Sequence, residues 1–255
     1  MNTRITRKRI MKDMKEVKDL ENMGIYVHWN EDDMFKAWAM IVGPEDTPYE
    51  KGFLFFEFTF PPRYPFENPS GKFLTSDGQT RLHPNLYTNG KICLSLLGTW
   101  AGPSWTSSQN FSSLLIAIQS LLNEWPLWNE PGFEDNKSKK SKDYNEMVRH
   151  QMYEISIIQQ FQNRLPRNCD CFRDKMIEIF KSNIHWHISK LMDYSTKFKN
   201  KKLIMQIYRR FTIPLRYNII LNQIVNIYNG LCENVDEMIL MDFGSKNEVV
   251  QETTD

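Results

Sequence analysis

The residues that could perform chemistry lie between His83 and Glu134, and the central one is Cys93. A cysteine flanked by Ile and Leu is, taken alone, more often a small core residue than a nucleophile. Its surroundings favour a nucleophile, because Asn85 lies eight positions upstream and Glu130 follows in a later loop. A thiol that accepts an acyl group and passes it to an amine needs an uncharged donor near the developing oxyanion, which the Asn85 amide supplies. It needs no strong base beside the sulfur, because such a base would also activate water against the thioester.

The acceptor that suits this chemistry is a lysine, whose ordinary pKa of about 10.4 keeps it protonated at neutral pH. A carboxylate at the mouth of the site can orient the ammonium group and take up its proton. Glu130 is the candidate, although an ordinary solvated loop acid is an equally good interpretation of that residue. His83 and Cys93 also match the residue types of a proteolytic pair. Pro84 directly follows His83 and favours a structural corner instead.

The segments upstream of this region predict a sheet that carries it. Three of them are rich in aromatic and β-branched residues, with short turn-rich connections, and predict an antiparallel meander. They are Ile25 to Trp29, Phe35 to Val42 and Phe53 to Phe60. The stretch FPPRYPFENPS excludes a helix and predicts an extended loop, followed by a short fourth strand near Lys72 to Thr75. Residues 83–97 are apolar but not periodic, which is typical of a packed functional loop, and Asn89-Gly90 predicts a tight turn within it.

Helical periodicity flanks the predicted sheet on both sides. An amphipathic helix with a basic outer face is expected before Gly24, and that face is either solvated or a docking surface for an acidic partner. Two more helices are expected near 111–122 and 144–161. We therefore predict an α+β domain over residues 1–163. Beyond it, only helical patterns remain (around 172–180, 203–208 and 220–228), which predict an all-helical extension over 164–243 and an acidic flexible tail over 244–255.

Composition excludes several classes of function. Lys and Arg total 32 against 31 Asp and Glu, so no global charge favours nucleic acid or an anionic membrane. No apolar run approaches the roughly 20 residues that span a bilayer, and the charged amino terminus does not resemble a signal peptide. Four cysteines are then most simply reduced thiols, which predicts a cytoplasmic or nuclear location. Cys169 and Cys171 with His185 and His187 lack the usual spacing of a zinc site, so no metal is predicted.

The motif His83-Pro84-Asn85, with Cys93 inside NGKICL, resembles the signature of ubiquitin-conjugating enzymes. The stretches GPEDTPYEKG and FPPRYPFENP, and the later Ser-Trp before a Leu-rich helix, occur in the order and spacing of that family. LSLLGTWAGPSW, NEPGFE, YNEMVRH and CDC are similar to the Z-type class, whose chains are large. The resemblance extends roughly from residue 5 to residue 195 and fades afterwards.

This resemblance implies a fold with a four-stranded antiparallel meander flanked by helices, and a role for each site residue. Cys93 would accept ubiquitin or a ubiquitin-like modifier from an activating enzyme as a thioester and transfer it to a substrate lysine. Asn85 would stabilise the oxyanion, His83 would brace the loop, and Glu130 falls where the family has its gating acid. No bound cofactor is implied, because ATP is consumed by the upstream activating enzyme. The alternative is a catalytically idle scaffold that binds ubiquitin or a ligase, but the intact thiol favours an enzyme.

The resemblance also implies partner surfaces. Arg9 and Lys12 match positions that meet the acidic surface of the activating enzyme and of ligases, while Phe66 and Trp105 match the ligase-binding loops. This sequence departs from the family at four places, which casts doubt on standard partners. Thr106-Ser107-Ser108 replaces Ser-Pro-Ala, Ser95 replaces an acid, and residues 98–103 are inserted beside the thiol. Tyr26 replaces the small residue that non-covalent ubiquitin contacts on the back face in many members of the family, so we expect that contact to be weak or absent.

Overall fold

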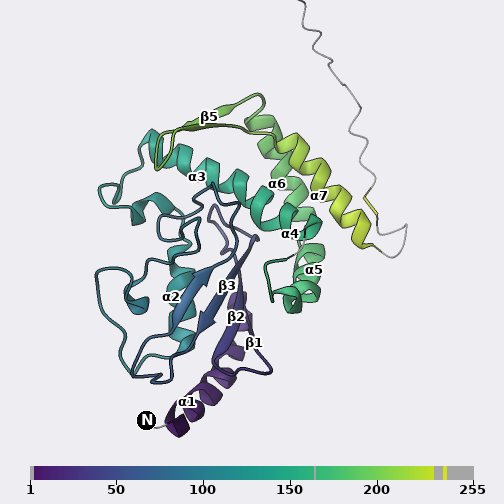
Figure 1. The fold of residues 1–255 in the computed structure, drawn as a ribbon. Coiled ribbons are helices and arrows are strands. Elements are labelled where there is room, and N and C mark those ends of the chain that lie inside the picture. Colours follow the sequence, from purple (N-terminus) through teal and green to yellow (C-terminus); the bar gives the residue numbers. More distant parts are fainter. Residues whose placement is uncertain (1–2, 164, 233–237, 240–255) are drawn as a thin grey trace, which may run out of the picture.

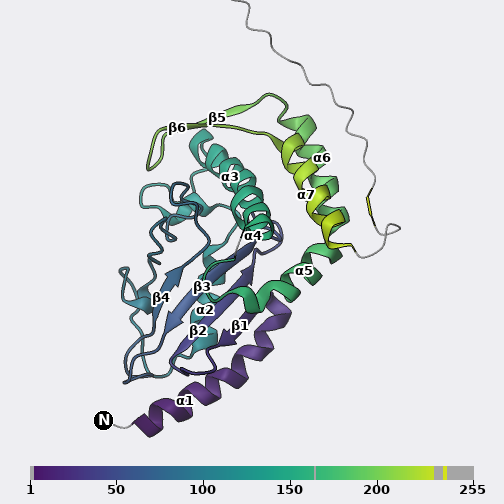
Figure 2. The ribbon, with the colours of Figure 1, turned by 45° about the vertical axis from the view of Figure 1, so that its right-hand side comes forward.

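The computed structural model describes residues 3–163, 165–232 and 238–239. Its centre is an antiparallel sheet with the strand order β1-β2-β3-β4 (Figures 1 and 2), which confirms the predicted meander. The strands are β1 (Ile25–Trp29), β2 (Lys36–Val42), β3 (Phe53–Thr59) and β4 (Ser70–Phe73). β4 begins and ends two residues earlier than predicted. The tail predicted over 244–255 lies outside the described residues.

One helix of the domain precedes the sheet in the sequence, and another follows it. α1 (Thr3–Glu16) continues as the 3-10 helix η1 (Val17–Met23) and ends where Gly24 adopts a φ of 74°. α2 (Phe111–Leu121) begins with a capping box between Asn110 and Ser113, which satisfies two backbone donors. Phe111 is fully buried and its ring lies 5.0 Å from that of Phe58 on β3, so α2 packs against one face of the sheet.

A longer helical rod crosses one end of the sheet (Figures 1 and 2). It consists of α3 (Lys139–Gln151), a π-helical stretch η4 (Met152–Ile158) and α4 (Gln159–Gln162). Ser156 donates its hydroxyl proton to the carbonyl oxygen of Met152, 2.6 Å away, inside the π-helical stretch. The predicted helix over 144–161 is therefore confirmed as one segment with a local change of winding.

The extension contains the predicted helices and, between them, a hairpin that was not predicted. Its helices are η5 (Asp170–Phe172), α5 (Arg173–Ser182), α6 (Ile184–Lys197) and α7 (Tyr217–Leu231). The prediction of a helix over 203–208, and with it an extension that is entirely helical, is wrong, because β5 (Lys202–Met205) pairs antiparallel with β6 (Phe211–Pro214). Burial alternates along β5, with Leu203 and Met205 inside and Ile204 exposed, which is the period of a strand.

None of the helices in the described part of the chain is long and apolar enough to cross a bilayer.

Candidate active site

Cys93 lies in the long connection from β4 to α2, where a pair of hydrogen bonds joins it to Asn85. The Cys93 backbone N–H donates to the carbonyl oxygen of Asn85, and Asn85 Nδ2 donates to the carbonyl oxygen of Cys93, both at 2.8 Å. The cysteine is a free thiol and 2% exposed. The loop is thus the packed structure predicted from its sequence, and the amide side chain is held directly beside the cysteine.

The tight turn between Asn85 and Cys93 depends on Gly90. This residue has a φ of 93°, and a Cβ atom there would lie 2.9 Å from the carbonyl oxygen of Phe73. Both the left-handed backbone and the close approach to β4 favour glycine. The predicted Asn-Gly turn is confirmed, and it returns the chain so that Ile92 pairs with Leu86.

His83 is fully buried and uses both ring nitrogens in hydrogen bonds. Its Nδ1 accepts the backbone N–H of Asn85 at 2.9 Å, so Nε2 must carry the ring proton, which it donates to the carbonyl oxygen of Leu121 at 2.8 Å. Burial lowers the pKa of His83 to about 3. The ring is therefore neutral and fully engaged at physiological pH. This geometry supports a brace between the Asn85 corner and the end of α2, and it argues against a base for Cys93.

The side-chain amide of Asn85 does not use all of its hydrogen-bonding groups among the described residues. Its Oδ1 is buried without a partner, and among the described residues the only acceptor for Nδ2 is the Cys93 carbonyl oxygen. An amide nitrogen carries two protons, so one N–H is available to a negatively charged oxygen formed beside Cys93. The amide therefore has a donor with which it can stabilise an oxyanion.

Thr99 is a site residue that the sequence did not single out. It lies in the inserted segment 98–103, and its hydroxyl donates to the carbonyl oxygen of Ile92 at 2.6 Å while accepting the N–H of Leu94 at 2.9 Å. These two backbone groups flank Cys93 on either side. The second residue of the inserted segment therefore fixes the backbone on both sides of the cysteine, a contact for which the sequence offers no periodic signal.

We predict that Thr99→Val lowers the free energy of unfolding by about 1 kcal/mol, because it removes the hydroxyl that bridges the two backbone groups. The same change should slow the loading of Cys93 without lowering its final extent, because the thiol is less firmly placed. Denaturant unfolding and a loading time course measure the two effects. Thr106→Val is the matched control, since that hydroxyl contacts only exposed Ser108, and it should change neither quantity. Equal behaviour of the two variants would contradict the assignment.

Glu130 ends the 3-10 helix η3 (Pro126–Asn129), and its N–H donates to the carbonyl oxygen of Leu127. The preceding residue, Asn129, places its amide nitrogen 3.4 Å from His83 Nε2, so this loop packs against the His83 corner. Glu130 is half-buried, and its Oε2 accepts a hydrogen bond from the hydroxyl of Tyr208 at 2.5 Å. The acid is thus held by a residue of the extension, a partner that sequence reasoning did not identify.

The predicted partner-binding residues divide into two groups. Arg9 is engaged inside the protein: it pairs with fully buried Asp13 at 2.9 Å and donates to the carbonyl oxygens of Ser107 and Gln109. Only 18% of its side chain is exposed, against 69% for Lys12. The structure therefore assigns Arg9 to the junction of α1 with the loop before α2, and Lys12 remains on the surface.

Phe66 and Trp105 lie on adjoining loops but differ in exposure. Phe66 is 64% exposed, as a docking residue requires. Trp105 is only partly exposed, and its Nε1–H donates to the carbonyl oxygen of Pro65 at 2.8 Å. Trp105 therefore holds the two loops together, and Phe66 is the side chain that it presents to solvent.

The sheet face opposite α2 is partly covered by the extension. Phe172 of η5 lies against His28 and Phe55, with ring centroids 6.4 and 6.1 Å away. Next to it, the Lys175 ammonium lies 5.8 Å from the Tyr26 ring. The expectation that Tyr26 weakens a back-face contact with ubiquitin stays a prediction, and this cover adds a second obstacle to such a contact.

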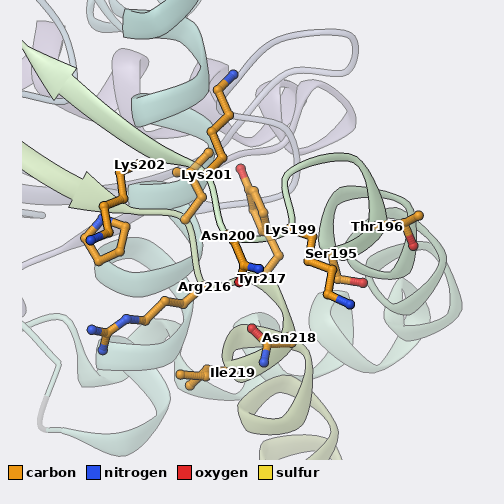
Figure 3. A pocket seen from close by; sticks show the side chains of 12 residues that line it. Ser195, Thr196, Lys199, Asn200, Lys201, Lys202, Arg216, Tyr217, Asn218 and Ile219 are labelled. Atoms are coloured by element: carbon orange, nitrogen blue, oxygen red, sulfur yellow. The ribbon is translucent and has the colours of Figure 1, made fainter. Parts of the chain in front are cut away.

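A cavity of about 770 Å³ lies within the extension, between the end of α6 and the start of α7 (Figure 3). Its lining includes Lys199, Lys201, Lys202 and Arg216, but no cysteine, histidine or carboxylate. The cationic ends spread in different directions around the rim in Figure 3 and do not converge on one point. This cavity therefore lacks the groups of an active site.

Cys169 does not offer a second reactive centre. Cys169 is buried, and burial raises the pKa of its thiol to about 12, so it stays protonated. Within the part of the chain that the structure describes, no group of three or more His, Cys, Asp and Glu side chains could hold a metal ion. The chemistry therefore concentrates on the loop around Cys93.

Comparison with known proteins finds similarity to one enzyme family. The model of the ubiquitin-conjugating enzyme family matches residues 9–154, which is more than half of the chain.

 Within that range lie His83, Asn85, Cys93, Thr99 and Glu130, whereas Tyr208 lies beyond it.

The chain is 44% identical over 165 residues to ubiquitin-conjugating enzyme E2 Z of Xenopus tropicalis, covering 64% of this chain and 51% of that protein. It is also 44% identical over 160 residues to ubiquitin-conjugating enzyme E2 Z of Homo sapiens, covering 62% of this chain and 45% of that protein. The chain thus spans about half the length of these curated relatives. A solved structure of the ubiquitin-conjugating enzyme Pex4p of H. polymorpha, in complex with the soluble domain of Pex22p, aligns with a TM-score of 0.46 and 23% identity, covering 59% of this chain and 96% of that one.

Proposed function

We propose that this chain, which belongs to the ubiquitin-conjugating enzyme family, carries ubiquitin or a ubiquitin-like modifier as a thioester on Cys93 and transfers it to a lysine. The predicted family is confirmed, and the similarity to E2 Z proteins matches the predicted Z-type class. The observation that carries the proposal is the reciprocal pair of hydrogen bonds between Cys93 and Asn85. It sets an uncharged donor beside the cysteine, while both ring nitrogens of His83 are engaged with the backbone.

The proposed reaction has two acyl transfers. In the first, the Cys93 thiolate attacks the thioester carbonyl carbon of the modifier on the activating enzyme, a new C–S bond forms, and the activating enzyme's sulfur leaves as a thiolate. In the second, a neutral lysine amine attacks the same carbonyl carbon, a C–N bond forms, and the Cys93 sulfur leaves. Each attack passes through an oxyanion, and the free N–H of Asn85 is the proposed donor to it.

Glu130 is proposed to act on the acceptor in the second step. Its carboxylate would orient the incoming ammonium group and take up the proton that this group must release to become the neutral amine that attacks. His83 has no proton-transfer role in this proposal, because both of its ring nitrogens are engaged with the backbone. No bound cofactor is needed for either transfer, and ATP would be consumed only by the activating enzyme that supplies the modifier.

The proposed partners are the modifier, the activating enzyme, a ligase and the protein substrates. Lys12 and the exposed Phe66 support a partner surface at α1 and the adjoining loop, because both project into solvent. Arg9 and Trp105 would contribute indirectly, by fixing the loops that border this surface. Nucleic acid and membrane partners are not part of the proposal, and the cytoplasmic or nuclear location stays a prediction.

The decisive experiment incubates the protein with an activating enzyme, ATP and a modifier, and follows a reducible adduct on a non-reducing gel. We expect an adduct that is lost in Cys93→Ala and retained in Cys171→Ala, because Cys171 is an exposed thiol outside the site. Absence of an adduct with every activating enzyme and modifier would leave the idle scaffold as the better description. An adduct that survives in Cys93→Ala would place the reactive thiol elsewhere.

A further inference from the structure

The hairpin of the extension crosses over α3 and brings its turn toward the active-site loops (Figures 1 and 2). Met205, Ile207 and Phe211 line a small cavity together with Tyr144 and Met147 of α3. Met205 is 2% exposed and Tyr144 is 1% exposed, so the hairpin is docked on α3 by apolar contact. The turn between β5 and β6 is therefore held in one place relative to the catalytic domain.

Tyr208 lies in this turn and contacts the proposed acid of the active site. Its φ of 62° is left-handed, which is costly for an aromatic residue and must be maintained by its contacts. The hydroxyl donates to Glu130 Oε2 at 2.5 Å, and the ring meets that of Tyr144 edge-on at 6.3 Å. Burial, Tyr144 and the bond to Glu130 all raise the pKa of Tyr208, so its hydroxyl keeps the proton that it donates.

The same ring also contacts the start of the His83 corner. The Arg81 guanidinium lies between two aromatic rings, 4.1 Å from the centroid of Tyr208 and 3.6 Å from that of Tyr87. Arg81 donates to the carbonyl oxygen of Pro84, and its own carbonyl oxygen accepts the Tyr144 hydroxyl at 2.7 Å. Tyr208 is thus joined on one side to Glu130 and on the other to the residues that precede Asn85.

We propose that Tyr208 is a positioning residue for lysine transfer: from the extension, it fixes Glu130 so that the carboxylate faces the incoming amine. This inference rests on the proposed function, since it assigns a purpose to Glu130 in the second transfer. Tyr208 occupies Oε2 of the carboxylate, which leaves Oε1 for the ammonium group of the acceptor. The extension is then part of the active site and not only an added surface.

The test is discharge of the preloaded thioester in the full chain, with Tyr208→Phe compared with the parent. Free lysine is the acceptor in one set of reactions, and hydroxylamine is the acceptor in the other. Hydroxylamine is uncharged at neutral pH and has no ammonium group to orient. We expect Tyr208→Phe to slow discharge to saturating lysine about tenfold, as expected for a loosely held catalytic group, while discharge to hydroxylamine changes less than about twofold.

Two controls separate positioning from general damage to the docked extension. Tyr217→Phe removes a hydrogen bond of the same chemistry, in which the hydroxyl of α7 donates to Glu146 of α3 at 2.6 Å. That bond lies outside the Glu130 contacts, so this variant should discharge to lysine as the parent does. In a Glu130→Ala background, Tyr208→Phe should have almost no further effect, because a residue that acts only through Glu130 loses its role with it.

The outcomes distinguish a failure of the inference from a failure of the proposed function. Unchanged or faster discharge to lysine in Tyr208→Phe would overturn the inference and leave the proposed function intact. Equal slowing with lysine and hydroxylamine, or an undiminished effect in the Glu130→Ala background, would assign Tyr208 to stability alone and overturn the inference as well. A parent protein that forms no thioester would overturn the proposed function and the inference together.

Discussion

Asn85→Ala is expected to slow transfer from the Cys93 thioester to lysine by about 10²- to 10³-fold, the usual effect of removing one oxyanion donor. The substitution removes the amide whose Nδ2 lies 2.8 Å from the carbonyl oxygen of Cys93 and whose second N–H is free. Amine attack on a thioester depends strongly on stabilisation of the oxyanion. The final extent of loading should be retained, because exchange between two thioesters has a more reactive nucleophile. Single-turnover discharge of the preloaded protein measures the transfer rate.

The same substitution could also disturb the loop, so a second variant of similar shape is needed. Asn85→Asp preserves the size and planarity of the side chain but replaces the N–H donor with an acceptor. We expect it to be at least as slow as Asn85→Ala in transfer to lysine. Rapid transfer by Asn85→Asp would mean that the side chain supports the loop only, and equal rates for all three proteins would remove Asn85 from the mechanism.

Much of the catalytic domain could be predicted because its signals are local. The first three strands have aromatic and β-branched composition with short connections, and these features depend on a few neighbouring residues. The predicted turn at Gly90 has the same local origin, since a left-handed backbone selects glycine. The predicted bounds of β4 differ from the observed ones by two residues. The proline-rich loop before β4 indicates where strand pairing is prevented, but it does not indicate at which residue pairing begins.

The hairpin of the extension was missed because its sequence imitates a helix. Leu203, Ile204, Ile207 and Tyr208 have spacings that place apolar residues on one helical face. The chain instead buries Leu203 and Met205, exposes Ile204, and turns at Tyr208. Pairing with β6 and docking on α3 decide this outcome, and both depend on residues distant in sequence. The contact of Tyr208 with Glu130, 78 positions away, was inaccessible for the same reason.

The direction of the Arg9 side chain could not be predicted from the sequence for a different reason. The resemblance placed Arg9 on a partner surface, but Asp13 follows it by four positions, which is the spacing of an ion pair on one helical face. The sequence does not indicate that Asp13 is buried. In the structure its carboxylate is fully buried and also accepts a hydrogen bond from the hydroxyl of Tyr64. A buried carboxylate needs a partner, so the guanidinium turns inward. Position within a helix is therefore predictable here, whereas the direction of the side chain depends on tertiary packing.

Acidification from pH 7.5 to 5.5 is expected to lower the free energy of unfolding by about 4 kcal/mol, through three buried histidines. Burial lowers the pKa of His83 and His187 to about 3 and that of His150 to about 4. In the unfolded chain each has an ordinary pKa of about 6.5. Between those values the unfolded state binds more protons than the folded state, so stability rises with pH through this window and is lost as pH falls.

The size of the effect follows from the protons that only the unfolded chain can bind. At pH 5.5 each unfolded histidine is mostly protonated while its folded counterpart is neutral, which costs about 1.3 kcal/mol per residue relative to pH 7.5. Burial raises the pKa of Glu50 and Glu154, and these carboxyls oppose the trend in part. Denaturant unfolding at the two pH values measures the difference.

His187→Gln isolates one histidine at a position away from the active site, where the ring packs against Tyr153 and Phe180. The variant is expected to be less stable at both pH values, but the difference between them should shrink by about 1.3 kcal/mol, because one titrating group is gone. An unchanged difference would show that His187 does not titrate as its burial requires. Since His83 stays neutral across the same range, protonation of this ring should not contribute to a loss of lysine transfer on acidification.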